Sequence, residues 1–268
     1  ACLAEGDWDG AFKAAKRVID EGGYAVGTKS DLTGGMNSLD KQNVMWGAGI
    51  QVADQAGGYA GFFTHMDNKE GAYAKSAPKL ISKQLYNRIS ATDIRRDWWD
   101  PSDKESPYVS KKFSFANVAS FLGDYIYMRV EEMYFTAAEA ALRLDDLKSA
   151  RELMNTVMAE RDPGYSANNR SGTLLGATTT TWTGSFLENI LTHRRIELWG
   201  EYGRLFDVRR LGQGIDRRTD DAFSEECISM MNRRNVNITK ADTYDWVLTI
   251  PKAELDANPN INEEDQNP

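Results

Sequence analysis

Long apolar runs, cysteine and histidine are all scarce in this sequence of 268 residues. It contains no run of 18 apolar residues, so we expect no membrane-spanning helix. The two cysteines, Cys2 and Cys227, are too few for a disulfide framework and are expected to be small buried apolar residues. The histidines, His65 and His193, have no HExxH spacing and no cysteine pair accompanies them, so no metal site is predicted.

Positively charged residues are also relatively few. The 32 Lys and Arg residues are outnumbered by 40 Asp and Glu, which gives a formal net charge of -8. A nucleic-acid surface needs clustered Lys and Arg to meet phosphates, so no nucleic-acid partner is expected. The sequence also has no phosphate-binding glycine motif and no G-x-S-x-G nucleophile motif, and no cofactor is predicted.

The first residues do not have the features of a secretion signal, because no basic segment followed by an apolar one precedes the rest. Residues 1–5 read as the end of an amphipathic helix that is already under way. We therefore expect that the N-terminal part of the natural protein is absent from this chain. Cys2 would need a cleavable segment before it to serve as a lipid anchor, and only Ala1 is there.

Helical periodicity is clear over residues 3–22, 124–144, 146–161 and 185–201, and we expect a helix in each segment. Asp7 is a candidate N-cap within the first. The link at residues 144–146 is short, so the two helices that it joins should pack antiparallel. An internal repeat supports this arrangement, because apolar positions of the first segment recur 139 residues later: Trp8, Ala11, Ala15 and Val18 match Leu147, Ala150, Met154 and Val157.

The remaining segments have a different composition. Residues 30–119 are rich in glycine, aromatic residues and turn signals, which predicts a long loop-rich insertion with short helices and a strand or two. Residues 163–184 should form an exposed loop, 244–250 an extended segment, and the tail a surface strap. The predicted fold class is therefore mainly α: tetratricopeptide-like helical pairs over residues 1–29 and 120–212, the insertion over 30–119, and an irregular region with a strap over 213–268.

Three segments resemble the SusD/RagB family, in the same order and at suitable spacing. Residues 127–140 resemble its R-x-x-E-x-x-x-x-x-A-E-A helix, and residues 194–212 resemble its RR-x-EL-x-x-E-x-x-R-x-x-D-x-x-R motif. Residues 250–260 and 266–268 are similar to its terminal IP-x-x-E-x-x-x-NPN and QNP segments. His193 departs from the pattern, since the family commonly has Glu before the Arg pair, and the family's long N-terminal region with its lipidated cysteine is missing.

The resemblance implies the SusD-like helical fold, with this chain as the C-terminal portion of a single domain. Family members are lipoproteins on the outer face of the outer membrane. They capture ligands, usually oligosaccharides and occasionally peptides, for a SusC-like, TonB-dependent transporter. The resemblance thus implies a Gram-negative cell-surface location through a lipid anchor outside this chain. It also implies that the missing half contributes part of the ligand surface.

The charged motif of the second segment is interpreted as structural. Its charges fall at steps that place opposite signs one helical turn apart, where they can pair with each other and with helix ends. A structural role is therefore expected for Arg194, Arg195, Glu197, Glu201, Arg204, Asp207 and Arg210.

Sugar binding calls instead for aromatic rings that stack on pyranose C–H faces and for polar side chains that bind hydroxyls. The ligand candidates are Tyr59, Phe62, Phe63, Tyr73, Trp98, Trp99, Trp46, Asp67, Asn68, Arg95 and Trp182. Among them, Trp46 lies in an apolar run and is favoured as a core residue. One of the adjacent Trp98 and Trp99 rings would point into the core if the backbone is extended. The polar candidates default to solvated surface.

The main hypothesis is a non-catalytic glycan-binding subunit for outer-membrane uptake. A second hypothesis is a pure interaction scaffold, in which the acidic surface and residues 213–245 meet a protein partner. A third is a glycoside hydrolase, which would need two carboxylates across a cleft. Among 40 acidic residues no such pair can be singled out.

Overall fold

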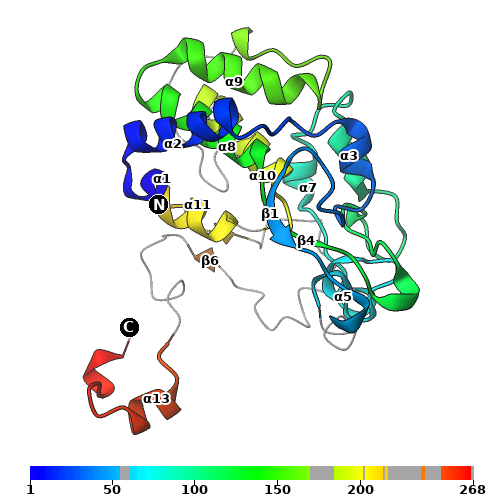
Figure 1. The fold of residues 1–268 in the computed structure, drawn as a ribbon, viewed down its shortest axis with the longest axis vertical. Coiled ribbons are helices and arrows are strands. Elements are labelled where there is room, and N and C mark those ends of the chain that lie inside the picture. Colours follow the sequence, from blue (N-terminus) through cyan, green and yellow to red (C-terminus); the bar gives the residue numbers. More distant parts are fainter. Residues whose placement is uncertain are drawn as a thin grey trace.

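The computed structural model of the chain describes residues 1–54, 61–169, 184–201, 203–213, 215–216, 237–238 and 249–266. The candidates Tyr59 and Trp182 lie outside these residues, as do Cys227 and most of residues 213–250. Figure 1 shows a helical part that contains α2, α8, α9 and α10, and beside it the insertion, which runs from α3 to β4.

The helical part is built from α2 (Trp8–Glu21), α8 (Val130–Arg143), α9 (Leu147–Ala159) and α10 (Phe186–Glu197). Helix α8 contacts each of the other three. Small buried residues such as Ala15, Ala138 and Ala150 belong to the apolar cluster that these helices share, so their backbones can approach closely. The mainly helical fold class predicted from the sequence is confirmed.

The matched segments begin in the same way. A residue with positive φ, Gly6 (79°) or Asp145 (65°), precedes an Asp that caps the helix. The side chain of Asp7 accepts a hydrogen bond from the amide of Gly10, and that of Asp146 accepts one from Ser149. The positive φ at Gly6 ends a short helix α1 (Cys2–Glu5), so the segment predicted as one helix over residues 3–22 is two.

The insertion has a core of its own and is more than a set of loops. An apolar cluster is centred on large rings and aliphatic side chains, among them Trp98, Trp99, Phe113 and Ile81. The elements around it are α3 (Lys29–Thr33), β1 (Val44–Ala48), η1 (Val52–Asp54), α5 (Phe62–Met66), α6 (Ala72–Ser76), α7 (Lys83–Tyr86), η2 (Ile94–Trp98), β2 (Trp99–Asp100), β3 (Val109–Ser110), η3 (Val118–Ser120) and β4 (Tyr125–Arg129).

Strand β4 corrects the helix predicted over residues 124–144, because α8 begins only at Val130. Residues Tyr125–Arg129 pair antiparallel with β1, Val44 opposite Arg129 and Ala48 opposite Tyr125. Aromatic and β-branched side chains such as Tyr125 and Ile126 favour a strand where a partner is present. That partner lies about 80 residues earlier in the chain, so the local pattern gives no sign of it.

The remaining described elements are short. They are η4 (Ala167–Asn169), α11 (Arg204–Arg210), the antiparallel pair β5 (Ile215–Asp216) and β6 (Asn237–Ile238), α13 (Lys252–Ala257) and η6 (Glu263–Asp265). The tail predicted as an extended strap therefore contains two short helices of its own, α13 and η6. The side chain of Gln266 ties the segment together, since it hydrogen-bonds the amide and the carbonyl of Ile250.

Candidate functional site

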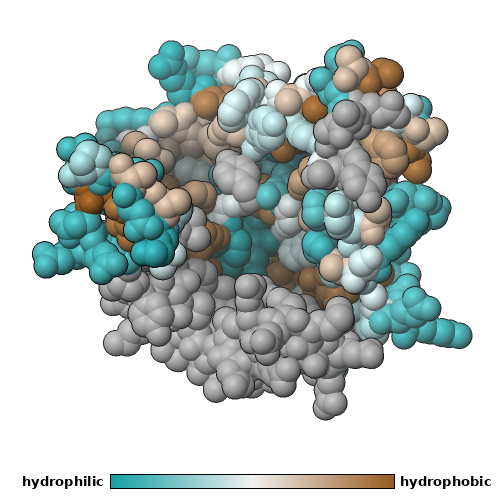
Figure 2. Space-filling model, turned by 90° about the horizontal axis from the view of Figure 1, so that it is seen from below, coloured by the Kyte–Doolittle hydropathy of each residue, from teal (hydrophilic) through white to brown (hydrophobic). Residues whose placement is uncertain are grey.

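A groove of about 500 Å³ lies along the β1–β4 pair. Strand β4 supplies four consecutive lining residues, and the others come from β1, α5 and segments distant in sequence. The lining residues are Met36, Trp46, Phe62, Phe113, Tyr125, Ile126, Tyr127, Met128 and Glu201. The face seen in Figure 2 is hollowed near its centre, and both hydrophobic and hydrophilic residues surround the hollow.

Two exposed aromatic rings stand beside each other at this groove. Trp46 is 61% exposed and Tyr127 is 40% exposed, and their ring centroids lie 5.1 Å apart in an edge-to-face arrangement. Trp46 was expected in the core, and the structure places it at the surface instead, because the two-stranded sheet leaves the middle of each strand uncovered. Exposed rings next to an apolar groove are the kind of surface on which a sugar ring stacks.

The backbone beneath the pair is closely packed. A Cβ at Gly47 would meet the carbonyl oxygen of Tyr125 and the side chain of Leu39. Strands β1 and β4 also shift register on either side of Trp46. Glycine at position 47 therefore allows the two strands to approach where the aromatic pair is formed.

The side of the groove formed by α5 consists of contacting rings. Phe62 lies edge-on to Phe113, with centroids 5.2 Å apart, and 6.1 Å from Tyr125. The hydroxyl of Tyr125 accepts a hydrogen bond from the backbone amide of Phe62 (3.3 Å). This contact joins the start of α5 to β4, so the two sides of the groove are held together.

Glu201 is the charged residue of the groove lining, and its side chain is 10% exposed. Its carboxylate accepts two hydrogen bonds from Arg129, at 2.9 and 2.8 Å, and one from Lys112 at 2.6 Å. Burial alone would raise the pKa of Glu201, but the charges of Arg129 and Lys112 hold that pKa below its ordinary value. Glu201 is therefore ionised at neutral pH.

Behind Glu201 lies a fully buried charge network around Glu197. The carboxylate of Glu197 accepts hydrogen bonds from Arg95 (3.1 Å), Arg129 (3.0 Å) and Arg161 (3.0 and 3.1 Å). Glu131 pairs with the latter two arginines at 3.0 and 2.9 Å. With the addition of Asp93, which pairs with Arg95, and of Lys112 and Glu201, the network contains equal numbers of cations and carboxylates. Such balance is what a buried charge cluster requires.

A second cluster joins α11 to α8 and α10. Arg194 donates to Asp207 and Glu132, each at 3.0 Å. Arg210 donates to both oxygens of Glu139 at 2.7 Å and to Asp207 at 2.8 Å. Asp207 and Arg210 are one helical turn apart, as the sequence suggested, whereas the other pairs connect different helices.

The two remaining residues of the motif are partly buried. Arg204 donates to the side chain of Gln213 (3.3 Å), and Arg195 lies on α10. His193, which departs from the family motif, is buried, and its Nδ1 accepts a hydrogen bond from Arg95 at 2.8 Å, since arginine can only donate.

Several ligand candidates are instead part of the core. Phe63, Trp98 and Trp99 are buried in the cluster of the insertion, so both tryptophans face inward. Asp67 and Arg95 are buried too, which corrects the expectation of solvated surface. Asp67 accepts hydrogen bonds from the amides of Lys69, Glu70 and Phe115, and Arg95 belongs to the charge network. A carboxylate or guanidinium with this many fixed partners has a structural use where it lies.

Two candidates lie near the surface but away from the groove. Tyr73 on α6 is 41% exposed and stacks on His65, with centroids 4.7 Å apart. The side-chain amide of Asn68 bridges Lys79 and Ser110 through backbone hydrogen bonds of 2.8 Å. Among the ligand candidates that the structure describes, Trp46 and Phe62 therefore lie together at one cavity.

Sequence reasoning did not identify most of the groove. Tyr125, Ile126, Tyr127 and Met128 were assigned to a helix, and Glu201 was considered only as a structural residue. The run of aromatic and β-branched residues before Arg129 was the available signal for a strand. Its pairing with β1 could not be read from local periodicity.

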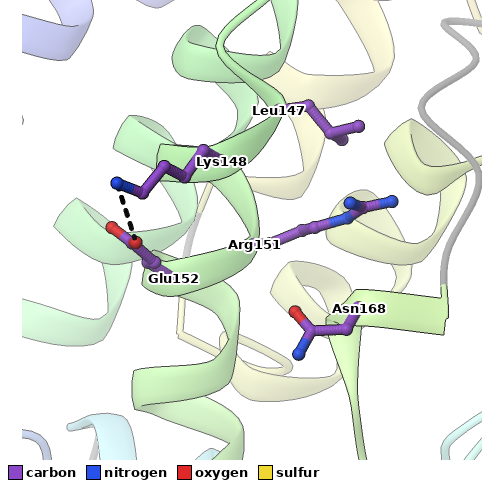
Figure 3. Close-up of a pocket in the computed structure, with 5 residues that line it drawn as sticks. All are labelled: Leu147, Lys148, Arg151, Glu152 and Asn168. Carbon is purple, nitrogen blue, oxygen red and sulfur yellow. Dashed lines mark ion pairs between the residues drawn. The ribbon is translucent and has the colours of Figure 1, made fainter.

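A second cavity, of about 410 Å³, lies on α9 and is lined by Leu147, Lys148, Arg151, Glu152 and Asn168. Figure 3 shows that Lys148 and Glu152 form an ion pair along the helix (3.9 Å) while Arg151 extends on the side of Asn168. The paired side chains are 86% and 66% exposed, and none of the described residues that line the cavity is aromatic. It therefore offers a sugar less than the β1–β4 groove does.

The described residues offer neither a metal site nor a membrane-spanning helix. They contain no group of three or more His, Cys, Asp or Glu side chains that could hold a metal ion. In the same part of the chain, no helix has both the length and the apolar character needed to cross a bilayer.

Comparison with known proteins defines the class. The model of the SusD family matches residues 63–268, which is most of the chain, so the chain belongs to the SusD family. No curated protein matches the sequence.

Solved structures share the fold. A SusD superfamily protein from Bacteroides vulgatus has a TM-score of 0.75 and 18% identity, and covers 98% of this chain and 55% of its own. A SusD-like carbohydrate binding protein from the same species has 26% identity and a TM-score of 0.62, and the match covers 79% of this chain and 43% of that one. Surface glycan-binding protein A from Bacteroides uniformis has a TM-score of 0.62 and 18% identity, with coverage of 99% and 58%. The chain thus spans about half the length of the structures that it matches.

Proposed function

We propose that this chain binds a glycan in the β1–β4 groove without cleaving it. The exposed pair of Trp46 and Tyr127 carries the proposal, since it combines an aromatic platform with a cavity large enough for sugar units. Membership of the SusD family supports it, as do the names of two proteins with this fold, one a SusD-like carbohydrate binding protein and one a surface glycan-binding protein.

The chemistry of the groove suits a sugar. The apolar lining matches the C–H faces of pyranose rings, and the carboxylate of Glu201 can accept a hydrogen bond from a hydroxyl. Glu201 is paired with two cations and its pKa is lowered, whereas a glycosidase acid needs a raised pKa. This favours capture over hydrolysis, and a reducing-end assay with the purified full-length protein should stay flat.

We place the chain at the outer-membrane surface of a Gram-negative bacterium. There it would deliver its ligand to a SusC-like, TonB-dependent transporter, in keeping with the family. Copurification of such a barrel with the tagged protein from native membranes is the measurement for this part of the proposal. Recovery of the protein free of any barrel, under conditions that preserve such complexes, would count against it.

Binding is tested with a matched set of variants. We expect Trp46→Ala and Tyr127→Ala each to weaken glycan binding about tenfold or more, a loss of about 1.4 kcal/mol or more, because each variant removes one ring of the aromatic platform on which the C–H face of a pyranose stacks. The measurement is isothermal titration with oligosaccharides first identified on a glycan array.

The control is Tyr73→Ala, which removes the same ring from a position of the same exposure, 41% against 40% for Tyr127, outside the groove. The control should bind as the unaltered protein does. Equal loss in all three variants, or loss only in the Tyr73 variant, would place the ligand elsewhere.

A further inference from the structure

The charge of the groove limits which glycans it can hold, an inference that rests on the proposed function. Of the described residues that line the groove, Glu201 alone is charged. The cations beside it are hidden, since the side chains of Lys112 and Arg129 are both 0% exposed while that of Glu201 is 10% exposed. A ligand in the groove therefore meets the carboxylate of Glu201 and neither of the two cations beside it.

Lys112 has no donor left for a ligand. Its ammonium has three N–H bonds, and they reach the carbonyl of Glu197 (2.7 Å), the carbonyl of Trp199 (2.8 Å) and the carboxylate of Glu201 (2.6 Å). The ammonium also lies over the ring of Trp98, 4.6 Å from its centroid. Each of these contacts holds it away from the groove.

Arg129 is occupied in the same way. Its Nε and Nη2 donate to the two oxygens of Glu201, and Nη2 also donates to the carbonyl of Glu197 (3.1 Å). Its Nη1 donates to the carboxylate of Glu197 and lies 3.0 Å from that of Glu131. All of its nitrogens thus face acceptors within the protein, and none is left to receive an anionic ligand.

Glu201, in contrast, retains acceptor capacity. Its Oε1 accepts from Lys112 and from Nη2 of Arg129, whereas Oε2 accepts only from Nε of Arg129 among the described residues. A carboxylate oxygen can accept about two hydrogen bonds, so one position on Oε2 is open. The groove thus offers a charged acceptor together with apolar walls.

We infer that the groove selects uncharged glycans, with a hydroxyl of the sugar over Trp46 and Tyr127 donating to Oε2 of Glu201. A uronic acid or a sulfated sugar at this position would bring a second negative charge next to Glu201, and neither Lys112 nor Arg129 has a free N–H to offset it. A neutral sugar meets no such repulsion and gains a hydrogen bond to a charged acceptor. Glu201 is in this way a specificity-determining residue.

The test compares glycans that share linkage and ring stereochemistry and differ in the group at C6, which is neutral in one member of each pair and charged in the other. Isothermal titration of the full-length protein at pH 7 uses matched pairs: cello-oligosaccharides against β-1,4-oligoglucuronates, β-1,4-manno-oligosaccharides against mannuronates, and methyl-esterified against free oligogalacturonides. We expect the neutral member of any bound pair to bind at least tenfold more tightly than its acidic counterpart.

Two variants test whether Glu201 causes the preference for neutral over acidic glycans. Glu201→Gln keeps an acceptor oxygen and removes the charge, so the ratio between acidic and neutral affinities should move toward one. The double variant Lys112→Met with Glu201→Gln removes one cation together with one anion and keeps the network balanced. It provides the same comparison if the single variant fails to fold, which circular dichroism will show.

The outcomes separate the inference from the proposed function. If an acidic glycan binds as tightly as its neutral counterpart or more tightly, or if the ratio is unchanged in both variants, the charge selection is overturned while glycan binding stands. If no glycan of either kind binds, both are overturned. Neutral preference that is lost in either variant supports both.

Discussion

Glu197 places a single carboxylate among three guanidinium groups, all of them fully buried. The arginines come from η2, the end of β4 and the segment after α9, so this one residue joins the insertion to the helical part. Breaking a buried pair by removing one partner leaves uncompensated charge. The network therefore fixes the position of β4, and with it the groove.

We expect Glu197→Gln to lower the free energy of unfolding by about 3–5 kcal/mol, because three buried arginines then lack their shared anion. The control is Glu152→Gln on α9, where the side chain is 66% exposed and its pair with Lys148 contributes less than about 1 kcal/mol. Urea unfolding of both variants is the measurement. Similar stability of the two would mean that the network does not hold the fold.

Buried carboxylates also make the stability of the fold depend on pH. Burial alone would raise the pKa of Glu197, but Arg161, Arg129 and Arg95 hold that pKa well below its ordinary value. The pKa values of Glu201 and Asp207 are lowered as well, each against the effect of burial, by Arg129 and Lys112 for Glu201 and by Arg194 and Arg210 for Asp207. A lowered pKa stabilises the folded state above the pKa of the unfolded chain, and this contribution is lost as pH falls.

The free energy of unfolding should therefore decrease as pH drops below about 4.5, the ordinary pKa of a Glu side chain. Urea unfolding at a series of pH values between 7 and 3 measures the slope. In the Glu197→Gln variant the slope should be shallower, because one of the linked groups is gone. An unchanged slope in that variant would mean that Glu197 does not contribute to the pH dependence of stability.

At the scale of elements, the pair of strands β1 and β4 decides where the groove lies. Its two strands are separated in sequence by most of the insertion, residues 49–124, and meet with shifts of register around Trp46. A bulged strand bends and turns its side chains to new directions, which is a frequent feature beside functional sites. The aromatic pair of Trp46 and Tyr127 is produced by this irregular pairing.

Gly47 provides a test of the close approach. Gly47→Ala should destabilise the protein by about 1–3 kcal/mol, because the new Cβ meets the backbone of Tyr125. Gly49→Ala, where the nearest atom would be 3.8 Å away, should change the free energy of unfolding by less than about 0.5 kcal/mol. Thermal unfolding of the two variants gives the comparison, and equal effects would mean that the strands can separate without loss.

The helices were predictable because their signals are local. Periodicity and the acidic turns locate α9 within two residues, and the sequence alone indicates the Asp7 cap. The start of α8 was wrong because Tyr125–Arg129 carries apolar residues that fit either period. The groove was not predictable, because its lining residues are scattered along the sequence between Met36 and Glu201 and come together only when β1 pairs with β4. For the same reason, Trp46 was predicted to be buried but is exposed, and Arg95 was predicted to be exposed but is buried.

At the scale of the whole molecule, the chain belongs to the SusD family and spans about half the length of the solved structures that it matches. Its scaffold, α2 with α8, α9 and α10, is the part that the sequence predicts well (Figure 1). The groove stands where this scaffold meets the insertion, and the charge network lies between the two. We therefore regard scaffold and network as the support for a ligand site on the insertion side.

The proposed ligand site is the aromatic pair of Trp46 and Tyr127 in the β1–β4 groove. A crystal structure of the full-length protein with a neutral oligosaccharide that it binds in solution tests this directly. We predict a pyranose ring against the Trp46 and Tyr127 rings with a hydroxyl within hydrogen-bond distance of Oε2 of Glu201. A glycan bound elsewhere, for instance against His65 and Tyr73, with the groove empty, would show that the β1–β4 groove is not the glycan site.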